Sequence, residues 1–134
     1  MAFFLTADLS ELERQLLVER HLISPALAEE SSTRGVLVGT GECLSVMVNE
    51  EDHVRIQSIL SGFQPGEACA AARQLEAQLS GQLVFAESER WGYLTAFATN
   101  TGTGLRASVL IHLPGLVLTR EMERVIRGVA QMGF

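Results

Sequence analysis

The sequence predicts an α+β fold, in which a mostly antiparallel β-sheet has helices packed on one face. Short apolar runs follow one another through short turns instead of long crossovers, which favours antiparallel pairing. Longer segments repeat apolar residues at helical spacing. The 134 residues, of which 47% are hydrophobic, are enough for one domain with a core of its own. We therefore expect a single domain over residues 1–134.

The first helix is expected over residues 8–20, where leucines recur at helical spacing. Asp8 or Ser10 is its N-cap, because both side chains can accept a hydrogen bond from the first turn. Pro25 disfavours helical backbone at the residue before it and so ends this segment. A short helical turn through Ala28 follows.

Further helices are predicted downstream. Residues 66–80 are alanine-rich and amphipathic, and Pro65 suits the first turn of that helix. The last helix covers residues 119–131, with Thr119 as its N-cap and Gly133 as its stop.

The predicted strands are short and are separated by residues that favour turns. A loop over residues 31–35 precedes the first strand, and Gly39-Thr40-Gly41 joins the first two strands as a hairpin. A glycine-rich loop over residues 99–104 joins the last two. The strands are expected at residues 36–38, 44–48, 54–60, 91–98 and 105–113.

The charge composition excludes several functions. All 10 basic residues are arginines, so the chain has no lysine for a Walker-type phosphate loop or a Schiff base. The net charge of −6 argues against nonspecific binding to nucleic acid or to an anionic membrane, which needs basic patches. No run reaches the ~18 apolar residues of a membrane span. We expect neither nucleic acid nor a membrane as a partner.

The cysteines and the N-terminus predict a cytoplasmic protein. The first residues lack the cationic start of a secretory signal, and Asp8 ends their apolar run. Cys43 and Cys69 have no metal-type spacing and are expected to be reduced thiols in the core. We expect no metal site built from side chains.

Acidic residues are most concentrated at Glu50, Glu51 and Asp52, just before the third predicted strand. Adjacent carboxylates repel one another, so the cluster favours a bound positive group. A guanidinium fits well, because its paired donors match two carboxylate oxygens. A divalent metal ion is a rival ligand, and a solvated acidic turn is the plain alternative.

Two arginines are candidates for binding an anion. Arg55 follows the acidic residues on the third strand, and Arg106 begins the strand after the glycine-rich loop. Together on one sheet face they would clamp a phosphate, whereas each taken alone suits a surface ion pair. The loop itself would let backbone N–H groups approach an anion.

Isolated histidines and aromatic residues are weaker candidates. His21 and His112 stand beside apolar residues, which is more typical of structural histidines than of ligands. Trp91 and Phe97 are expected in the core instead of forming a platform for an adenine ring.

These segments together resemble the ATP:guanidino phosphotransferases, the family of creatine and arginine kinases. Residues 49–55, Asn-Glu-Glu-Asp-His-Val-Arg, look like the family's NEEDH motif with its following arginine. Residues 99–108 resemble its second signature loop. The runs at 18–25 and 112–119 are closest to the bacterial protein arginine kinases. The resemblance extends from about Glu11 to Phe134.

The resemblance implies part of a guanidino kinase catalytic domain with the glutamine-synthetase-like fold. The implied reaction is ATP-dependent phosphorylation of arginine in proteins, with ATP and Mg²⁺ and with phosphoarginine as the product. An activator or a homo-oligomer is compatible with it. A non-catalytic remnant that binds arginine, a nucleotide or a partner is the alternative.

The resemblance also assigns roles to residues of this sequence. Glu51 would be the catalytic residue that holds and orients the substrate guanidinium, and Asp52 would bind substrate beside it. The implied nucleotide-binding residues are His21, Arg55, Arg106, Ala107, Ser108, Val109 and Leu110.

The sequence also departs from the family pattern. Phe97 stands where the family has a reactive cysteine, and Ala98 where it has a proline, so no thiolate can polarise the guanidinium. Family chains are more than twice as long and carry phosphate-binding arginines before and after this region. Residues 31–34 superficially resemble the first of these elements but align with a linker. We therefore expect a partial domain with an open sheet edge.

Overall fold

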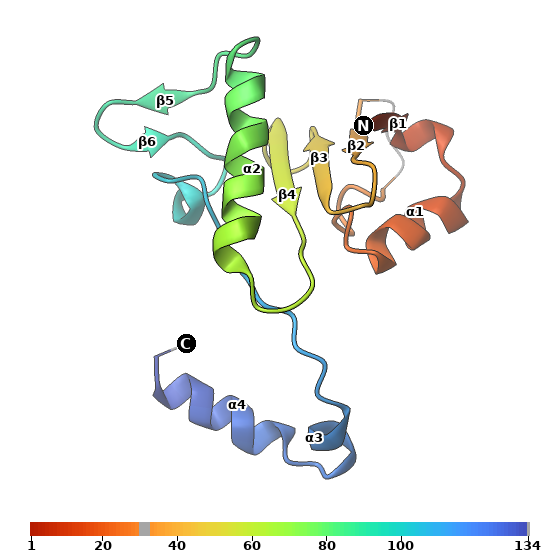
Figure 1. Ribbon diagram of the computed structural model, residues 1–134, viewed down its shortest axis with the longest axis vertical. Coiled ribbons are helices and arrows are strands. Elements are labelled where there is room, and N and C mark those ends of the chain that lie inside the picture. The colour runs from red at the N-terminus through yellow and green to blue at the C-terminus, as the bar shows by residue number, and fades with distance from the viewer. Residues whose placement is uncertain (30–32, 134) are drawn as a thin grey trace.

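A four-stranded antiparallel sheet forms the body of the computed structural model, which describes residues 1–29 and 33–133 (Figure 1). Its order along the sheet is β1 (Ala2–Leu5), β2 (Gly35–Val38), β3 (Leu44–Val48) and β4 (Val54–Ser58). The predicted α+β class, the antiparallel pairing and the hairpin of the first two predicted strands are confirmed. Part of the predicted loop at 31–35 lies outside the described residues.

Strand β1 was not predicted. It pairs along its whole length with β2, with Phe4 opposite Val36 in the register. Its four residues carry no alternation of polar and apolar side chains, which is the pattern that marks a strand in a sequence. The pairing of β1 with β2 therefore depends on tertiary contacts and could not be predicted from this short run of residues.

Helices α1 (Glu11–Glu19) and α2 (Pro65–Ser80) confirm two predicted segments, but they cover opposite faces of the sheet instead of one. Leu17 of α1 packs against the cluster that contains Met47. Helix α2 contacts β4, and Leu75 lines a cavity with Leu44 on that side. Successive strand residues point to opposite faces. Because β3 is apolar on both faces, each face needs a cover.

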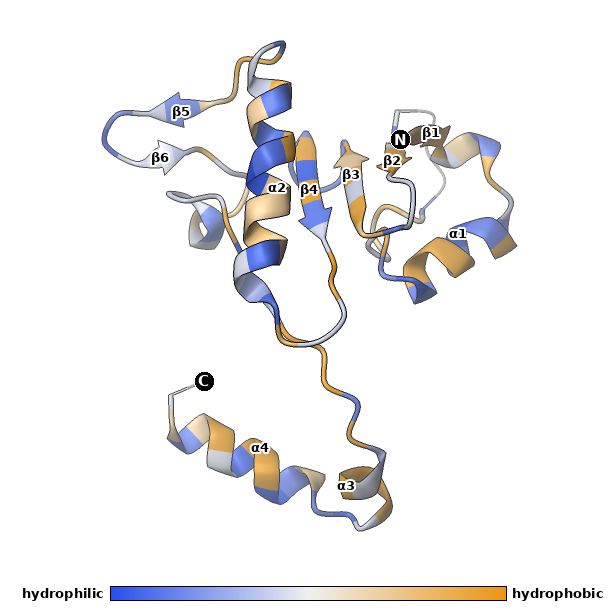
Figure 2. Ribbon diagram, viewed as in Figure 1, coloured by the Kyte–Doolittle hydropathy of each residue, from blue (hydrophilic) through white to orange (hydrophobic). Residues whose placement is uncertain are grey.

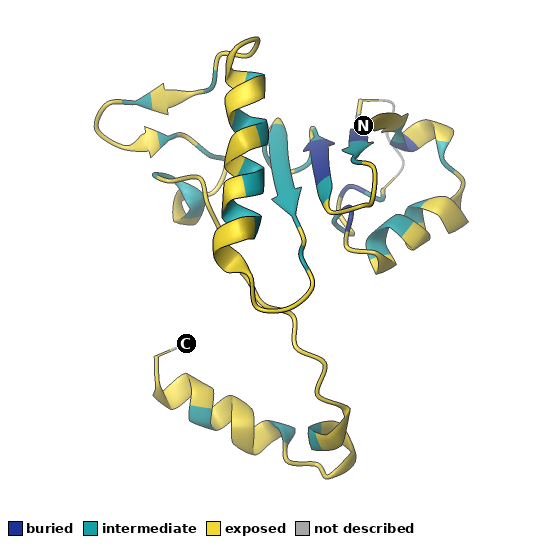
Figure 3. Ribbon diagram, in the orientation of Figure 1, coloured by how far each residue is buried: buried dark blue, intermediate teal, exposed yellow. Residues whose placement is uncertain are grey.

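The core lies where β2 and β3 meet the turn after α1 (Figure 3). Ser10, not Asp8, is the N-cap of α1: its Oγ accepts from the Glu13 amide at 3.3 Å, and the Glu13 carboxylate accepts from the Ser10 amide at 2.8 Å. The predicted turn through Ala28 is confirmed by amide bonds back to the Ser24 carbonyl. The buried apolar residues are Leu22, Ile23, Leu27, Val36, Val46 and Met47.

Two predicted strands are wrong in extent. Of residues 91–98 only β6 (Gly92–Tyr93) is a strand, and it pairs with β5 (Glu87–Ser88) in a separate ribbon. Residues 105–113 are irregular and pair with no described strand. They run from the body to the C-terminal helices (Figure 1). Their apolar content suits a strand, but a strand also needs a neighbour to bond with.

The C-terminal helix is shorter than predicted and is preceded by another. Helix α3 (Pro114–Leu118) ends at Thr119, whose hydroxyl donates to the Gly115 carbonyl at 2.8 Å. Thr119 therefore closes α3 instead of capping the next helix. Arg120 has φ 60°, and α4 (Met122–Gln131) begins after that break.

The C-terminal arm, residues 105–133, presents apolar side chains to solvent (Figure 2). On α4 these include Val125, Ile126 and Val129.

The cysteines also differ from the expectation of core thiols, because Cys43 is exposed and Cys69 is half-buried. Within the described ranges, no helix is both long enough and apolar enough to cross a membrane.

Candidate functional site

The acidic residues lie in the turn that joins β3 to β4. The Asn49 amide donates to the His53 carbonyl at 3.0 Å and closes the turn. Asn49 adopts φ 57°, which asparagine tolerates better than most residues, and its side-chain amide donates to the Thr33 carbonyl at 2.6 Å. These bonds hold the acidic turn, residues 49–53, at one end of the hairpin.

Glu50 is paired inside the protein. Its carboxylate accepts from Ser24 Oγ at 2.5 Å, from Arg55 Nη1 at 3.1 Å and from the Glu51 amide at 2.8 Å, and only 5% of its side chain is exposed. Burial alone would raise its pKa. The hydrogen bonds from Ser24 and the Glu51 amide, with the charge of Arg55, hold the pKa of Glu50 below its usual value.

Asp52 is also engaged. Its Oδ1 accepts from the Ala96 amide at 2.7 Å, which ties the acidic turn to the loop that carries Phe97. Thr95 fixes the same loop, because its hydroxyl donates to the Phe97 carbonyl at 2.7 Å. The segments of the two family motifs therefore lie side by side, although they are far apart in the sequence.

Glu51 differs from both neighbours. It is exposed, and no hydrogen bond or ion pair joins its carboxylate to any side chain or amide in the described ranges. Of the three clustered carboxylates, Glu51 is thus the one with neither oxygen bonded to the described part of the protein, so both remain available to an external positive group.

Close backbone contacts place the glycine-rich loop. Tyr93 and Gly102 form an isolated antiparallel bridge, with amide bonds of 2.9 and 3.1 Å in the two directions. A side chain at Gly92 would put its Cβ 2.4 Å from the Gly102 carbonyl oxygen, so only glycine allows this approach. The Tyr93 hydroxyl donates to Glu76 of α2, and this bond raises the pKa of Tyr93.

The predicted nucleotide-binding residues are only partly brought together. Arg55 lies on β4 beside the acidic turn. The His21 carbonyl accepts from the Gln57 side chain, which links the turn after α1 to the same strand. Arg106 and residues 107–110 are exposed on the irregular segment that leaves the body. Because Arg106 does not lie on a strand, the two arginines do not share a sheet face, and their joint binding of a phosphate stays a prediction.

The aromatic candidates are not in the core. Trp91 and Phe97 are 57% and 56% exposed, contrary to the expectation for both. Arg90 lies 4.6 Å above the Trp91 ring, a cation–π contact that suits a surface tryptophan.

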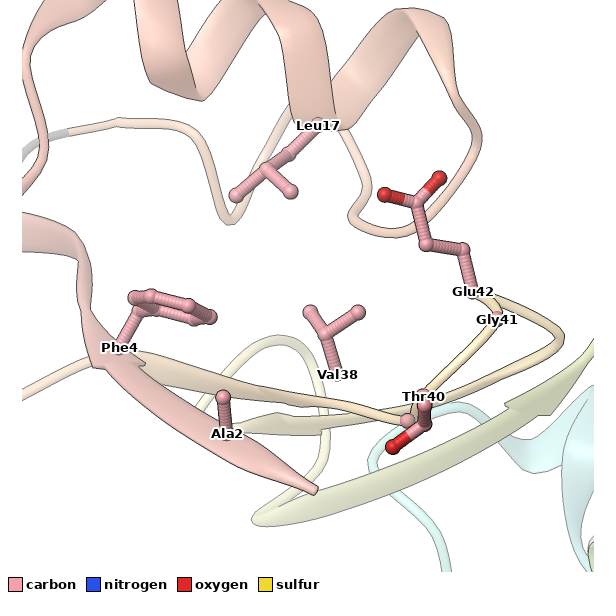
Figure 4. A pocket seen from close by; sticks show the side chains of 8 residues that line it. Ala2, Phe4, Leu17, Val38, Thr40, Gly41 and Glu42 are labelled. Carbon is pink, nitrogen blue, oxygen red and sulfur yellow. The ribbon is translucent and has the colours of Figure 1, made fainter.

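One cavity of the described residues lies elsewhere (Figure 4). It has a volume of about 340 Å³ and is lined by Phe4, Leu17, Val38 and Glu42 among others. It lies between α1 and the β1–β2 strands, and none of the predicted site residues lines it. Three or more metal-type side chains do not cluster anywhere in the described ranges.

The comparison with protein families decides the identity. The model of the ATP:guanido phosphotransferase C-terminal catalytic domain matches residues 2–134. The chain belongs to the ATP:guanido phosphotransferase family. The matched residues include the acidic turn and the glycine-rich loop.

Relatives and solved structures agree with this family. The chain is 49% identical over 128 residues to the protein-arginine kinase of Geobacillus thermodenitrificans, covering 96% of this chain and 35% of that protein. It is 50% identical over 128 residues to that of Symbiobacterium thermophilum, covering 96% and 36%. The duplicated taurocyamine kinase of Schistosoma mansoni with bound transition-state analogue components superposes with a TM-score of 0.78 at 27% identity, over 93% of this chain and 19% of that one.

This chain spans only about a third of the length of these curated relatives. Two of its site features were not found by sequence reasoning. Ser24 lies in the run 18–25 and just before Pro25, but neither feature predicts the role of its side chain, which bonds Glu50 across 26 positions of sequence. Gln57 was one residue of a predicted strand, and no local signal marks its bond to His21.

Proposed function

We propose that this chain carries part of the active site of a kinase that transfers the γ-phosphoryl group of ATP to arginine side chains of proteins. The proposal rests on which carboxylates of the acidic turn are hydrogen-bonded to the protein and which is not. Glu50 and Asp52 are bonded to the protein, while Glu51 offers an exposed carboxylate without a partner in the described ranges. Relatives named protein-arginine kinase support arginine in proteins as the acceptor.

Glu51 is the catalytic residue in this proposal. Its two oxygens accept paired N–H donors of the arginine guanidinium and turn one nitrogen toward the γ-phosphorus atom. As the N–P bond forms and the bond to the ADP oxygen breaks, the nitrogen loses a proton, which the carboxylate can take. Asp52 acts beside it by holding the loop that carries Phe97.

The nucleotide is held by positive charge. Arg55 and Arg106 neutralise the phosphate oxygens, whose charge is spread in the transition state of phosphoryl transfer. His21 and residues 107–110 complete the nucleotide contacts. Mg²⁺ comes with the nucleotide and neutralises the phosphates further. Glu50 does not fit as a ligand of that ion, because both of its oxygens already accept from protein donors.

Phosphoarginine formation tests the proposal. The purified chain is incubated with MgATP and an arginine-rich protein, and phosphorus NMR follows an acid-labile product. We expect a signal that is absent in Glu51→Gln, because the amide is a weaker acceptor and cannot take a proton. No signal at high enzyme concentration would contradict catalysis by this chain, and a signal that survives Glu51→Gln would contradict the role of Glu51.

A binding module is the second candidate function. Phe97 stands where the family has a cysteine, so this chain has no thiolate at that position. Groups of one preorganised site act as a unit, so loss of one of them can remove most of the rate. In this form the chain binds arginine, a nucleotide or a partner without turnover. Saturable binding of MgADP without any phosphoarginine would favour it. A cytoplasmic location, supported by two free cysteines, belongs to both candidates.

A further inference from the structure

The carboxylate of Glu50 joins three parts of the candidate site. One oxygen, Oε1, accepts from both Ser24 Oγ and Arg55 Nη1, and the other, Oε2, accepts from the Glu51 amide. With 5% of the side chain exposed, water cannot replace these donors freely. The position of Glu50 therefore fixes the backbone of Glu51 on one side and the guanidinium of Arg55 on the other.

Ser24 is the donor that comes from outside the hairpin. It lies in the turn after α1, where Leu22, Ile23 and Leu27 are buried in the core. Its hydroxyl also accepts from the Leu27 amide at 3.1 Å, so it is fixed both as a donor, to Glu50, and as an acceptor. Arg55, by contrast, belongs to the same hairpin as Glu50 and keeps 41% of its side chain exposed. Among the described donors to Glu50, Ser24 is thus the one anchored in the core.

We infer that Ser24 is a positioning residue of the phosphoryl-transfer site, which through Glu50 holds Glu51 and Arg55 in their working positions. This inference rests on the proposed function for the roles of Glu51 and Arg55. The hydroxyl touches neither substrate. It sets the geometry between the residue that holds the guanidinium and a residue that holds the nucleotide, and such geometry governs transfer rates.

The test uses the full chain and five variants. Ser24→Ala removes the donor, and Ser24→Thr keeps a hydroxyl. Ser10→Ala is the matched control, because it deletes a serine cap from α1 without contacting Glu50. Glu50→Gln and the double variant Ser24→Ala/Glu50→Gln complete a cycle. The measurements are the MgADP dissociation constant and the pH titration of the Glu51 amide signal by NMR, which reports ionisation of Glu50.

We expect Ser24→Ala to weaken MgADP binding about tenfold, as loss of a hydrogen bond to a charged group does. Its titration midpoint should rise, because the charged carboxylate has lost a donor. Ser24→Thr should restore both values, and Ser10→Ala should change neither. The double variant should bind no more weakly than Glu50→Gln, since Ser24 acts through Glu50.

Two results would overturn the inference. An unchanged Glu51 titration in Ser24→Ala would mean that Ser24 does not hold Glu50. Additive losses in the double variant would mean that Ser24 only caps its own turn. If the unchanged chain binds no MgADP, the proposed function fails separately, and the titration in Ser24→Ala still decides whether Ser24 positions the acidic turn.

Discussion

Glu50 has the most extensive bonding of the acidic turn, and its ionisation links the site to stability. Burial raises the pKa of Glu50 in the folded state. The bonds from Ser24 and the Glu51 amide and the charge of Arg55 lower it further than burial raises it, so the folded pKa lies below the usual 4.5. A depressed carboxyl pKa stabilises the folded state above the unfolded pKa. That contribution is lost as the pH falls through the folded pKa.

The pH dependence of the unfolding free energy tests the contribution of ionised Glu50 to stability. Glu50→Gln should unfold more easily than the unchanged chain near neutral pH, and the difference in unfolding free energy should shrink as the pH falls below about 4.5. Denaturant titrations at several pH values measure it. A difference that stays constant or grows on acidification would contradict the assigned bonds.

Gly92 is the residue on which the glycine-rich loop depends. Its φ is +71° and an added Cβ would meet the Gly102 carbonyl, so Gly92→Ala should destabilise the chain by more than about 1 kcal/mol. Gly66 in α2 has nothing within 4 Å of an added Cβ. Gly66→Ala is thus the control and should stabilise by up to about 1 kcal/mol. Equal effects of the two changes in denaturant titrations would refute the close approach.

At the scale of elements, α1 depends on its N-cap. Ser10→Ala removes the acceptor for the Glu13 amide and should lower the unfolding free energy by about 1 kcal/mol. Ser10→Asp keeps an acceptor and should retain most of it. Thermal unfolding of both variants, followed by circular dichroism, would show whether Ser10→Ala is the less stable. An equal loss of stability in both variants would contradict the role of Ser10 as a cap.

Elements defined by local patterns could be predicted from the sequence. Helix α1 and helix α2 have a periodic pattern, and the strands of the β2–β4 meander are short runs rich in apolar residues with turn residues between them. Residues 105–113 have a strand-like composition but no described partner, and pairing is not local information. The break at Arg120 separates α3 from α4, and no glycine or proline marks it in the sequence.

The candidate site could be predicted in composition but not in geometry. The motif segments indicated which residues matter, and the structure brings Asp52 to the Ala96 amide across 44 positions of sequence. The bond from Ser24 to Glu50 also joins distant positions, and serine has too many ordinary roles for its type to reveal this one. Which of the clustered carboxylates is available became visible only when their partners were known.

At the scale of the whole molecule, we expect the body to be more protected from amide exchange than the C-terminal arm. The body has a hydrogen-bonded sheet and a buried core, whereas residues 105–133 are mostly exposed and lack a ladder (Figure 3). Amide hydrogen exchange should therefore be slow in β2 and β3 and fast along the arm. Slow exchange over residues 105–113 would show that this segment pairs with something in solution.

The proposed kinase function requires that the chain bind a nucleotide through its arginines. Calorimetric titration of the unchanged chain with MgADP tests this most directly, with Arg55→Ala, Arg106→Ala and the exposed-arm control Arg124→Ala. We predict saturable binding that each of the first two changes weakens by about tenfold and that the control leaves as it was. No saturable heat, or equal effects of all three changes, would contradict the account.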